Sequence, residues 1–265
     1  MNNLSVTLIQ SNLHWESISE NLKIFSEKLS AVGKTDLIVL PETFSTGFSM
    51  NPKFAETMDG TAVEWMKKMA EEKNCVICGS LMINEDENFY NRFIWMKPNG
   101  DFSTYDKRHL FCISDEPKFF TAGTERLIVE LYGWKICPLI CYDLRFPVWA
   151  RNDKDEAYDI LLYVANWPER RNVAWKTLLP ARAIENQAYV IGANRVGVDE
   201  KNISHSGDSM VIDALGKILY HKEQEEDVFT IELNYDELQK VREQLPFLND
   251  ADDFVLNEKR KIKSH

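Results

Sequence analysis

The stretch 135–147 reads Lys135-Ile-Cys-Pro-Leu-Ile-Cys-Tyr-Asp-Leu-Arg-Phe-Pro147, an apolar run that stops at a thiol and is followed by polar, turn-forming residues. The apolar part is typical of a buried strand, so Cys141 lies where that strand ends. A thiol in this position can face a cleft, where free backbone N–H groups favour the thiolate. Although a lone cysteine is more often an inert core residue, we interpret Cys141 as a nucleophile because of the residues described next.

Two further reactive side chains have the same setting. Glu42 follows the apolar run Leu37–Leu40, and Lys107 follows the short segment Asp101–Tyr105. In layered α/β folds, residues at strand ends converge on one cleft even when they are far apart in the chain. We therefore expect Glu42, Lys107 and Cys141 to meet at one site.

The rest of the chain alternates strand-like runs with amphipathic stretches, which is typical of an α/β layered fold. We predict one domain, with helices at 17–31, 61–73 and 173–186, the last kinked by Pro180. The residues from Asn257 to His265 are predicted to form a polar tail. The predicted strands are 6–10, 37–40, 75–82, 90–96, 102–105, 127–131, 135–140, 160–164, 189–194, 209–212, 218–220 and 228–233.

The three reactive segments resemble the Glu, Lys and Cys motifs of the nitrilase superfamily of carbon-nitrogen hydrolases, in the same order and with a fitting spacing. Those segments are Pro41-Glu42, Tyr105-Asp-Lys107 and Ile140-Cys-Tyr-Asp-Leu-Arg-Phe-Pro147. Further similar segments run nearly from end to end: Leu40–Met50, Met58-Asp-Gly60, Tyr90-Asn-Arg92, Asn166-Trp-Pro168, Ala181–Gln187 and Asn194–Gly197. Among them, 46–50 and 166–168 are most similar to the omega-amidase branch.

The resemblance implies a four-layer αββα sandwich, in which two sheets face each other and helices cover both outer faces. It implies a single carbon-nitrogen hydrolase domain over residues 1–265. It also implies a homodimer or a higher homo-oligomer, in which the C-terminal tail from about Leu245 packs across the partner subunit.

The resemblance also implies a mechanism. An amide carbonyl resists attack, so its hydrolysis needs a strong nucleophile, a base and donors for the developing oxyanion. Glu42 takes the proton from Cys141, and Lys107 with the backbone N–H of Tyr142 holds the oxyanion. Ammonia leaves, a thioester remains, and water activated by Glu42 releases the acid. Glu42 must then be a stronger base than a free carboxylate, which partial burial would achieve.

Glu116 aligns with a second glutamate that many members of the superfamily carry beside the lysine segment. In the family pattern, Gly or Asn precedes this glutamate and His follows it, whereas Asp115 and Pro117 flank it here. Two interpretations stay open for Glu116, catalytic support and a solvated acid in a loop.

The substrate implied by the omega-amidase resemblance is a small dicarboxylic acid monoamide of the 2-oxoglutaramate or 2-oxosuccinamate type. Such a molecule carries a free carboxylate, which an arginine can bind through two parallel hydrogen bonds. Arg145 and Arg195 are the candidates, although either can instead serve the structure. The candidate aromatic pocket walls are Phe44, Tyr142, Phe146 and Trp167.

Composition restricts the partners. The chain has 265 residues, a net charge of −11 and 44% hydrophobic residues. Nucleic acid and anionic membranes normally need a basic patch, so neither is expected as a partner. We expect a cytoplasmic protein, because the first residues lack a signal peptide and no run is long enough to span a membrane. The odd number of five cysteines also fits a reducing compartment.

Neither a metal nor a cofactor is expected. Cys75 and Cys78 have the spacing of a metal-binding pair, but positions three apart on a strand point to opposite faces. Cys112 and Cys137 are assigned to packing. The sequence contains no P-loop, dinucleotide-binding glycine motif or zinc-protease motif.

Three alternatives remain open. The same three reactive residues would serve a nitrile or an N-carbamoyl amino acid hydrolase. A papain-like hydrolase would pair Cys141 with His109 or His205. A catalytically silent interaction protein would retain the sandwich, but the presence of all three reactive side chains weighs against it.

Overall fold

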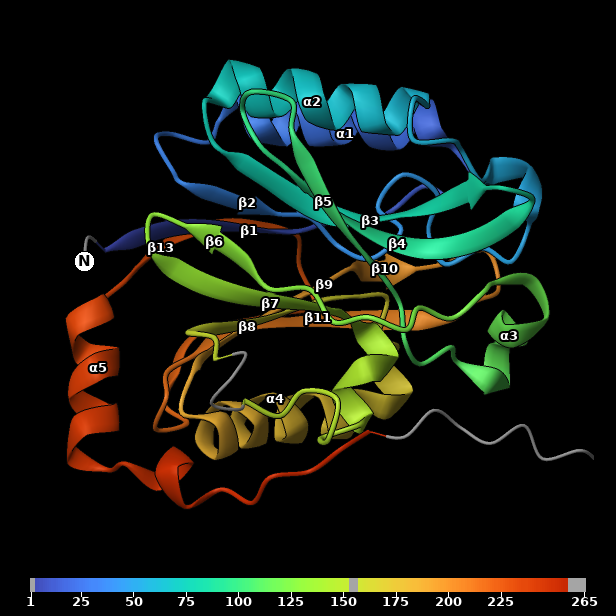
Figure 1. Ribbon diagram of the computed structural model, residues 1–265. Helices are drawn as coiled ribbons and strands as arrows, with labels where there is room; N and C mark the ends of the chain where they lie inside the picture. The colour runs from blue at the N-terminus through green and yellow to red at the C-terminus, as the bar shows by residue number, and fades with distance from the viewer. Residues whose placement is uncertain (1–2, 153–156, 257–265) are drawn as a thin grey trace, which may run out of the picture.

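Two β-sheets lie face to face between layers of helices, as Figure 1 shows. The structure is a computed structural model that describes residues 3–152 and 157–256. The first sheet has the strand order β13-β1-β2-β3-β4-β5, and the second has the order β10-β11-β9-β8-β7-β6, with β12 paired to β11. The strands are β1 (Leu4–Gln10), β2 (Leu37–Val39), β3 (Val76–Glu85), β4 (Asn88–Met96), β5 (Phe102–Asp106), β6 (Val129–Leu131), β7 (Trp134–Ile140), β8 (Ile160–Ala165), β9 (Tyr189–Asn194), β10 (Val196–Val198), β11 (Ser204–Ile212), β12 (Ile218–Glu223) and β13 (Asp227–Leu233).

Helices cover the outer face of each sheet (Figure 1). Helices α1 (Ile18–Ser30) and α2 (Thr61–Lys73) pack on the first sheet, and α4 (Asn172–Asn186) packs on the second. The short α3 (Glu116–Phe119) and the polar α5 (Tyr235–Gln244) lie at the margins of the layers. The layer order is therefore helix, sheet, sheet, helix, which confirms the expected αββα sandwich.

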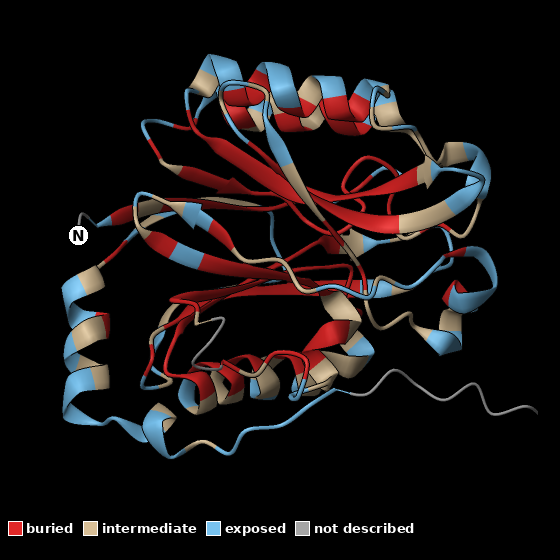
Figure 2. Cartoon of the chain, in the orientation of Figure 1, coloured by how far each residue is buried: buried red, intermediate tan, exposed pale blue. Residues whose placement is uncertain are grey.

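Buried residues concentrate between the layers, where Figure 2 shows them in red. One apolar cluster lies between the sheets and under α4, and a second lies between the first sheet and α1 and α2. Cys78 belongs to the first cluster and Cys75 to the second, so the two thiols point to opposite sides of the sheet. Burial raises the pKa of both, that of Cys75 to about 11. The two residues therefore cannot share one metal ion, as the sequence predicted.

The topology brings the carboxyl ends of several strands to one region of the fold. Strands β7, β8 and β9 run parallel, with Ile140 opposite Val164 and Ala165 opposite Asn194. In the first sheet, β2 runs parallel to both β1 and β3. Parallel strands buried on both faces read as continuous apolar runs, and β8 has six consecutive buried residues. The polar residues that follow these strands are thereby directed to the same cleft.

The predicted elements agree with the observed ones apart from a few differences. The three predicted helices are present, and α4 continues through Pro180. Strand β11 begins at Ser204 rather than at residue 209, and neither β10 nor α5 was predicted. The predicted tail from Asn257 to His265 lies outside the described residues. Within the described ranges, every helix is too short or too polar to cross a bilayer.

Candidate active site

Glu42, Lys107 and Cys141 meet between the two sheets. Glu42 follows β2 and Lys107 follows β5 in the first sheet, whereas Cys141 follows β7 in the second. The Lys107 Nζ donates to Glu42 Oε1 over 2.9 Å, and the Cys141 thiol lies beside the Glu42 carboxylate, so that burial and this carboxylate both raise the pKa of the thiol. The side chains of Glu42 and Lys107 are fully buried. The structure therefore brings together the three side chains that the sequence selected.

Glu116 joins the same cluster from α3. Its side chain is fully buried, and its Oε1 lies 3.1 Å from Lys107 Nζ. The backbone N–H of Phe111 donates to the other carboxylate oxygen. Lys107 thus bridges two buried carboxylates, and Glu116 is not a solvated acid in a loop. Asp115 beside it is exposed and pairs with Lys118 on the surface.

Burial and mutual charge set the protonation states of this cluster. Burial alone would lower the Lys107 pKa, but Glu116 and Glu42 raise it above its ordinary value, so the side chain is an ammonium at neutral pH. Burial raises the pKa of Glu116 against the opposing effect of Lys107. Burial and the charge of Glu42 raise the pKa of Cys141 well above its ordinary value, although Lys107 lowers it. Cys141 is therefore a thiol at rest, and it would have to lose its proton before it could attack a substrate.

Two asparagines that the sequence analysis did not select hold the carboxylates in place. Asn91 Nδ2 donates to Glu42 Oε1 over 2.8 Å and to Glu116 Oε1 over 3.3 Å. The backbone N–H of Asn166 donates to Glu42 Oε2 over 2.7 Å. The signal for Asn166 was its position directly after the apolar run 160–165, and both asparagines lie in segments that carry the family resemblance.

Asp143 joins the loop after Lys107 to the turn that carries Cys141. Its Oδ2 accepts from the Tyr105 hydroxyl over 2.7 Å and from the Ile140 backbone N–H over 3.0 Å. Its Oδ1 accepts from the His109 backbone N–H over 2.9 Å and contacts the His109 ring over 2.8 Å. Cys141 itself has φ of 44°, a conformation that is uncommon for a residue with a side chain. Asp143 therefore fixes the relative position of the two loops that bear the ammonium and the sulfur.

A cavity of about 300 Å³ opens onto Cys141 and Lys107. Of the predicted substrate-binding residues, Arg145 and Trp167 line it, as does Tyr142 next to Cys141. Cys141 is partly exposed to this space. The cavity has the size and the mixed polar and apolar lining of a site for a small ligand.

Three of the predicted pocket residues lie elsewhere, which corrects the sequence-based expectation. Arg195 is only 1% exposed, and its guanidinium donates to Asn12 Oδ1 over 2.8 Å and to a backbone carbonyl. Phe44 is buried among the aromatic rings under α1 and α2. Phe146 stacks on His109, with ring centroids 3.7 Å apart, and packs against Tyr142, which lines the cavity. Packing inside the fold accounts for all three.

Neither candidate histidine of a papain-like arrangement is bonded to Cys141 among the described residues. His109 is held by Asp143 and Phe146. His205 lines the cavity, but burial and the nearby Arg195 lower its pKa to about 4, so it is neutral at pH 7. Across residues 3–152 and 157–256, no hydrogen bond joins Cys141 to an imidazole. The Cys141 thiol lies beside the carboxylate of Glu42 instead.

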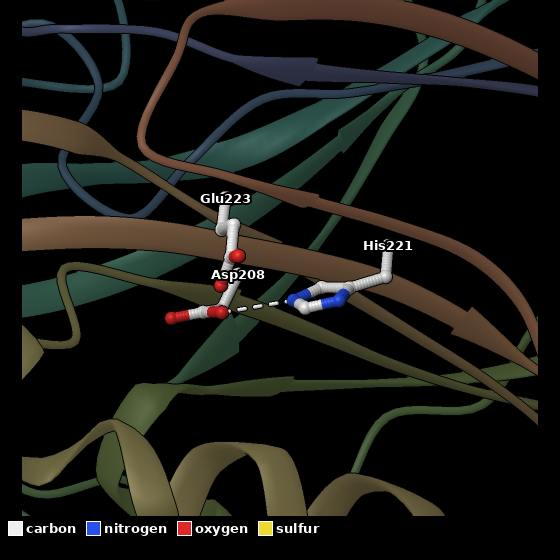
Figure 3. A group of neighbouring side chains, drawn as sticks. All are labelled: Asp208, His221 and Glu223. Carbon is white, nitrogen blue, oxygen red and sulfur yellow. Dashed lines mark hydrogen bonds and ion pairs between the residues drawn. The ribbon is translucent and has the colours of Figure 1, made fainter.

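A second group of titratable side chains lies outside this site (Figure 3). Asp208, His221 and Glu223 place one potential metal ligand atom each within 4.8 Å of one another. However, Asp208 already accepts from His221 over 2.8 Å and from Ser206 over 2.5 Å. Lys176 Nζ lies 3.6 Å from Asp208 and 4.0 Å from Glu223. Since this ammonium supplies the positive charge, we interpret the group as an ion network that fastens α4 to β11 and β12.

Comparison with known proteins decides the family. The family model described as Carbon-nitrogen hydrolase matches residues 5–243. The chain belongs to the carbon-nitrogen hydrolase family. The resemblance seen in the sequence is thereby confirmed, and it covers almost all of this carbon-nitrogen hydrolase.

Relatives of this carbon-nitrogen hydrolase include two proteins with named activities. It is 44% identical to omega-amidase YafV of Yersinia enterocolitica over 257 residues, which cover 97% of this chain and 100% of the relative. It is 34% identical to 2-oxoglutaramate amidase of Bacillus subtilis over 253 residues, which cover 93% of this chain and 96% of the relative. Both similarities extend over nearly the full length of each protein.

Solved structures of relatives have the same fold. The crystal structure of XC1258 from Xanthomonas campestris, a CN-hydrolase superfamily protein with an arsenic adduct in its active site, superposes with a TM-score of 0.95. It is 42% identical and covers 97% of this chain and 100% of its own. The crystal structure of Saccharomyces cerevisiae Nit3, a member of branch 10 of the nitrilase superfamily, superposes with a TM-score of 0.82 at 22% identity, which shows the fold alone.

Proposed function

We propose that this carbon-nitrogen hydrolase removes the terminal amide from small dicarboxylic acid monoamides of the 2-oxoglutaramate or 2-oxosuccinamate type and releases ammonia. The position of the Cys141 thiol beside the Glu42 carboxylate and the Lys107 ammonium, at a cavity that Cys141 and Lys107 line, carries this proposal. The names of the relatives, omega-amidase YafV and 2-oxoglutaramate amidase, support the choice of substrate.

The proposed reaction uses a cysteine thioester. Glu42 takes the proton from Cys141 as the sulfur attacks the amide carbon, and Lys107 with the backbone N–H of Tyr142 stabilises the oxyanion. The protonated Glu42 then gives its proton to the departing nitrogen, and ammonia leaves. Water activated by Glu42 attacks the thioester and releases the carboxylic acid and the thiol. The charge of Lys107 favours both oxyanions, since its raised pKa keeps it protonated throughout.

Glu116 supports this reaction through Lys107 in our proposal. A single buried ammonium between two carboxylates is held on both sides, so its position changes little when Glu42 becomes protonated. Arg145 and Trp167 line the cavity. This supports our proposal that Arg145 binds the substrate carboxylate and that Trp167 forms a wall of the site. No step of the proposed reaction requires a metal or an organic cofactor.

A panel of amides tests this function. We expect ammonia from 2-oxoglutaramate, 2-oxosuccinamate and succinamate at kcat/KM values at least about 10-fold above those for a nitrile and an N-carbamoyl amino acid of equal length, because the linear amide places its carbonyl between Cys141 and Lys107. Heat-treated enzyme is the control for spontaneous release. Turnover of the nitrile or the N-carbamoyl compound as the best substrate would assign a different reaction of the family.

We also propose a homodimer or a higher homo-oligomer of single-domain subunits, in which the C-terminal segment covers a neighbouring copy. Several large apolar side chains of this segment are exposed in the monomer: Leu245, Phe247, Phe254, Val255 and Leu256. Apolar surface of this kind favours a protein partner. Light scattering on the full chain is expected to give twice the monomer mass or a larger multiple, and a monomer at micromolar concentration would contradict the proposal. The five free cysteines support a cytoplasmic location for the assembly.

A further inference from the structure

Positive charge is concentrated around the cavity of a strongly acidic protein. Arg145, Arg170, Arg171 and Lys201 line the cavity together with the buried Lys107, although the net charge of the chain is −11. Lys107 is neutralised by its two carboxylates. In the part of the chain that the structure describes, the other four cations form no ion pair. Unpaired cations that line one cavity indicate a site for an anion.

The two acids on the cavity wall do not neutralise these cations. Asp115 forms its ion pair with Lys118 on the surface, over 3.0 Å. Asp199 accepts the backbone N–H groups of Lys201 and Ile203, each over 2.9 Å, and thereby shapes the loop. The guanidinium groups at the cavity are left without a carboxylate from the protein itself.

Aromatic rings orient two of these guanidinium groups. The Cζ atom of Arg145 lies 4.8 Å from the ring centroid of Trp167, and the Cζ atom of Arg171 lies 4.8 Å from that of Phe111. All four residues line the cavity. A guanidinium stacked on a ring keeps the N–H groups of its edge free for a planar acceptor such as a carboxylate. The two arginines are thus held in place by packing rather than by ion pairs.

The two arginines also lie close enough to affect one another. The pKa of Arg171 lies below its ordinary value, first because of burial and second because of Arg170, with a smaller contribution from Arg145. The Cys141 sulfur acts on it in the opposite direction, which places Arg171 within electrostatic reach of the nucleophile. An anion between the guanidinium groups would remove this repulsion.

We propose that Arg145 and Arg171 form a two-arginine subsite for the free carboxylate of the substrate, and that these charges, with Arg170 and Lys201, reject amides that carry an ammonium group. This inference rests on the proposed function and extends it to the choice between equally long substrates. Glutamine and 2-oxoglutaramate have the same carbon skeleton, amide and carboxylate, but glutamine carries an ammonium group next to its carboxylate. Binding of that carboxylate brings the ammonium toward like charges, which costs affinity.

The test compares three substrates on the wild type and Arg171→Gln. The wild type is expected to show a kcat/KM for 2-oxoglutaramate at least about 100-fold above that for glutamine. Arg171→Gln is expected to lower the 2-oxoglutaramate value by roughly 10- to 100-fold, mainly through KM, because a charge-assisted pair of hydrogen bonds is lost. The kcat/KM for butyramide, which has no charge, is expected to change by less than about 3-fold in Arg171→Gln, since the chemical step is intact. The ratio of kcat/KM for 2-oxoglutaramate to kcat/KM for glutamine is therefore expected to be smaller in Arg171→Gln than in the wild type.

Matched variants separate charge from geometry. Arg171→Lys keeps the positive charge but lacks the planar guanidinium. Its kcat/KM for 2-oxoglutaramate is expected to lie between the values of the wild type and Arg171→Gln. Lys217→Gln removes the same charge at an exposed position outside the cavity. It is expected to leave the kcat/KM values for all three substrates unchanged. Binding of 2-oxoglutarate, measured by calorimetry, gives a readout without turnover, and its Kd is expected to rise at least about 10-fold in Arg171→Gln.

Distinct results would overturn the subsite and the function. An unchanged Kd for 2-oxoglutarate, or an unchanged preference over glutamine, in folded Arg171→Gln overturns the subsite alone. An equal loss on butyramide and 2-oxoglutaramate assigns Arg171 to the catalytic step and also overturns it. A wild-type enzyme that releases ammonia from none of the amides but binds 2-oxoglutarate overturns the proposed function and leaves the anion site standing.

Discussion

Replacement of Cys141 by serine is expected to lower kcat/KM for 2-oxoglutaramate by at least about 10,000-fold, because the covalent route depends on this sulfur. The hydroxyl of Ser is a far weaker acid than a thiol, so Glu42 cannot generate the nucleophile. The side chain changes by one atom, hence the fold and the melting temperature should stay as in the wild type. Ammonia release and thermal melting, followed by circular dichroism, measure the two effects.

Cys112 provides the matched control for this experiment. It is an exposed free thiol at the start of a short 3-10 helix, so the packing role expected from the sequence is wrong, and it is not among the residues that line the cavity. Cys112→Ser should therefore retain full turnover. Substantial activity in Cys141→Ser, or a loss in Cys112→Ser that equals it, would show that Cys141 is not the nucleophile.

Lys107→Met is expected to abolish turnover and also to lower the free energy of unfolding by about 3–5 kcal/mol, because two buried carboxylates lose the ammonium that lies between them. The pKa of Lys107 is raised above its ordinary value of 10.5, so its stabilising contribution is complete at neutral pH and is lost only as the solution becomes strongly alkaline. Urea unfolding at pH 7 measures the loss, and ammonia release measures the turnover.

A compensating variant separates the effect of charge from that of packing. Addition of Glu116→Gln and Glu42→Gln to Lys107→Met removes all three buried charges, and it should recover much of the stability but none of the activity. Lys118→Met is the control, since its ion pair with Asp115 is exposed and should contribute no more than about 0.5 kcal/mol. If the triple variant is as unstable as Lys107→Met, the buried charges do not explain the loss.

Local patterns in the sequence predicted most of the strands and helices, and they predicted that the reactive side chains would meet. Apolar runs that end at Glu42 and Cys141 predicted both the strands and the reactive residues, because strand ends in parallel sheets meet at one edge. The short strand β10 was missed since its three residues carry no period. Helix α5 was missed because its surface is largely polar, although Asn234 caps it by accepting from the backbone N–H of Glu237.

The substrate-binding side chains could not be selected with the same success. Arg195 follows an apolar strand as Cys141 does, yet its guanidinium donates a hydrogen bond to Asn12 inside the fold. Arg171 has no distinctive neighbours in the sequence, and it lies at the cavity with its guanidinium against the ring of Phe111, a residue 60 positions earlier in the chain. Contacts between segments that are distant in the chain determine which arginines face a ligand. The periodicity of the sequence therefore does not predict these arginines.

The raised pKa of Cys141 has a consequence for the survival of the enzyme. Peroxide and disulfides react with thiolates far faster than with thiols. A sulfur that stays protonated at rest, as the raised pKa of Cys141 implies, is therefore a poor target for adventitious oxidation. The protonated Cys141 sulfur therefore reacts slowly with small oxidants that enter the cavity. It becomes reactive when an amide is aligned for attack.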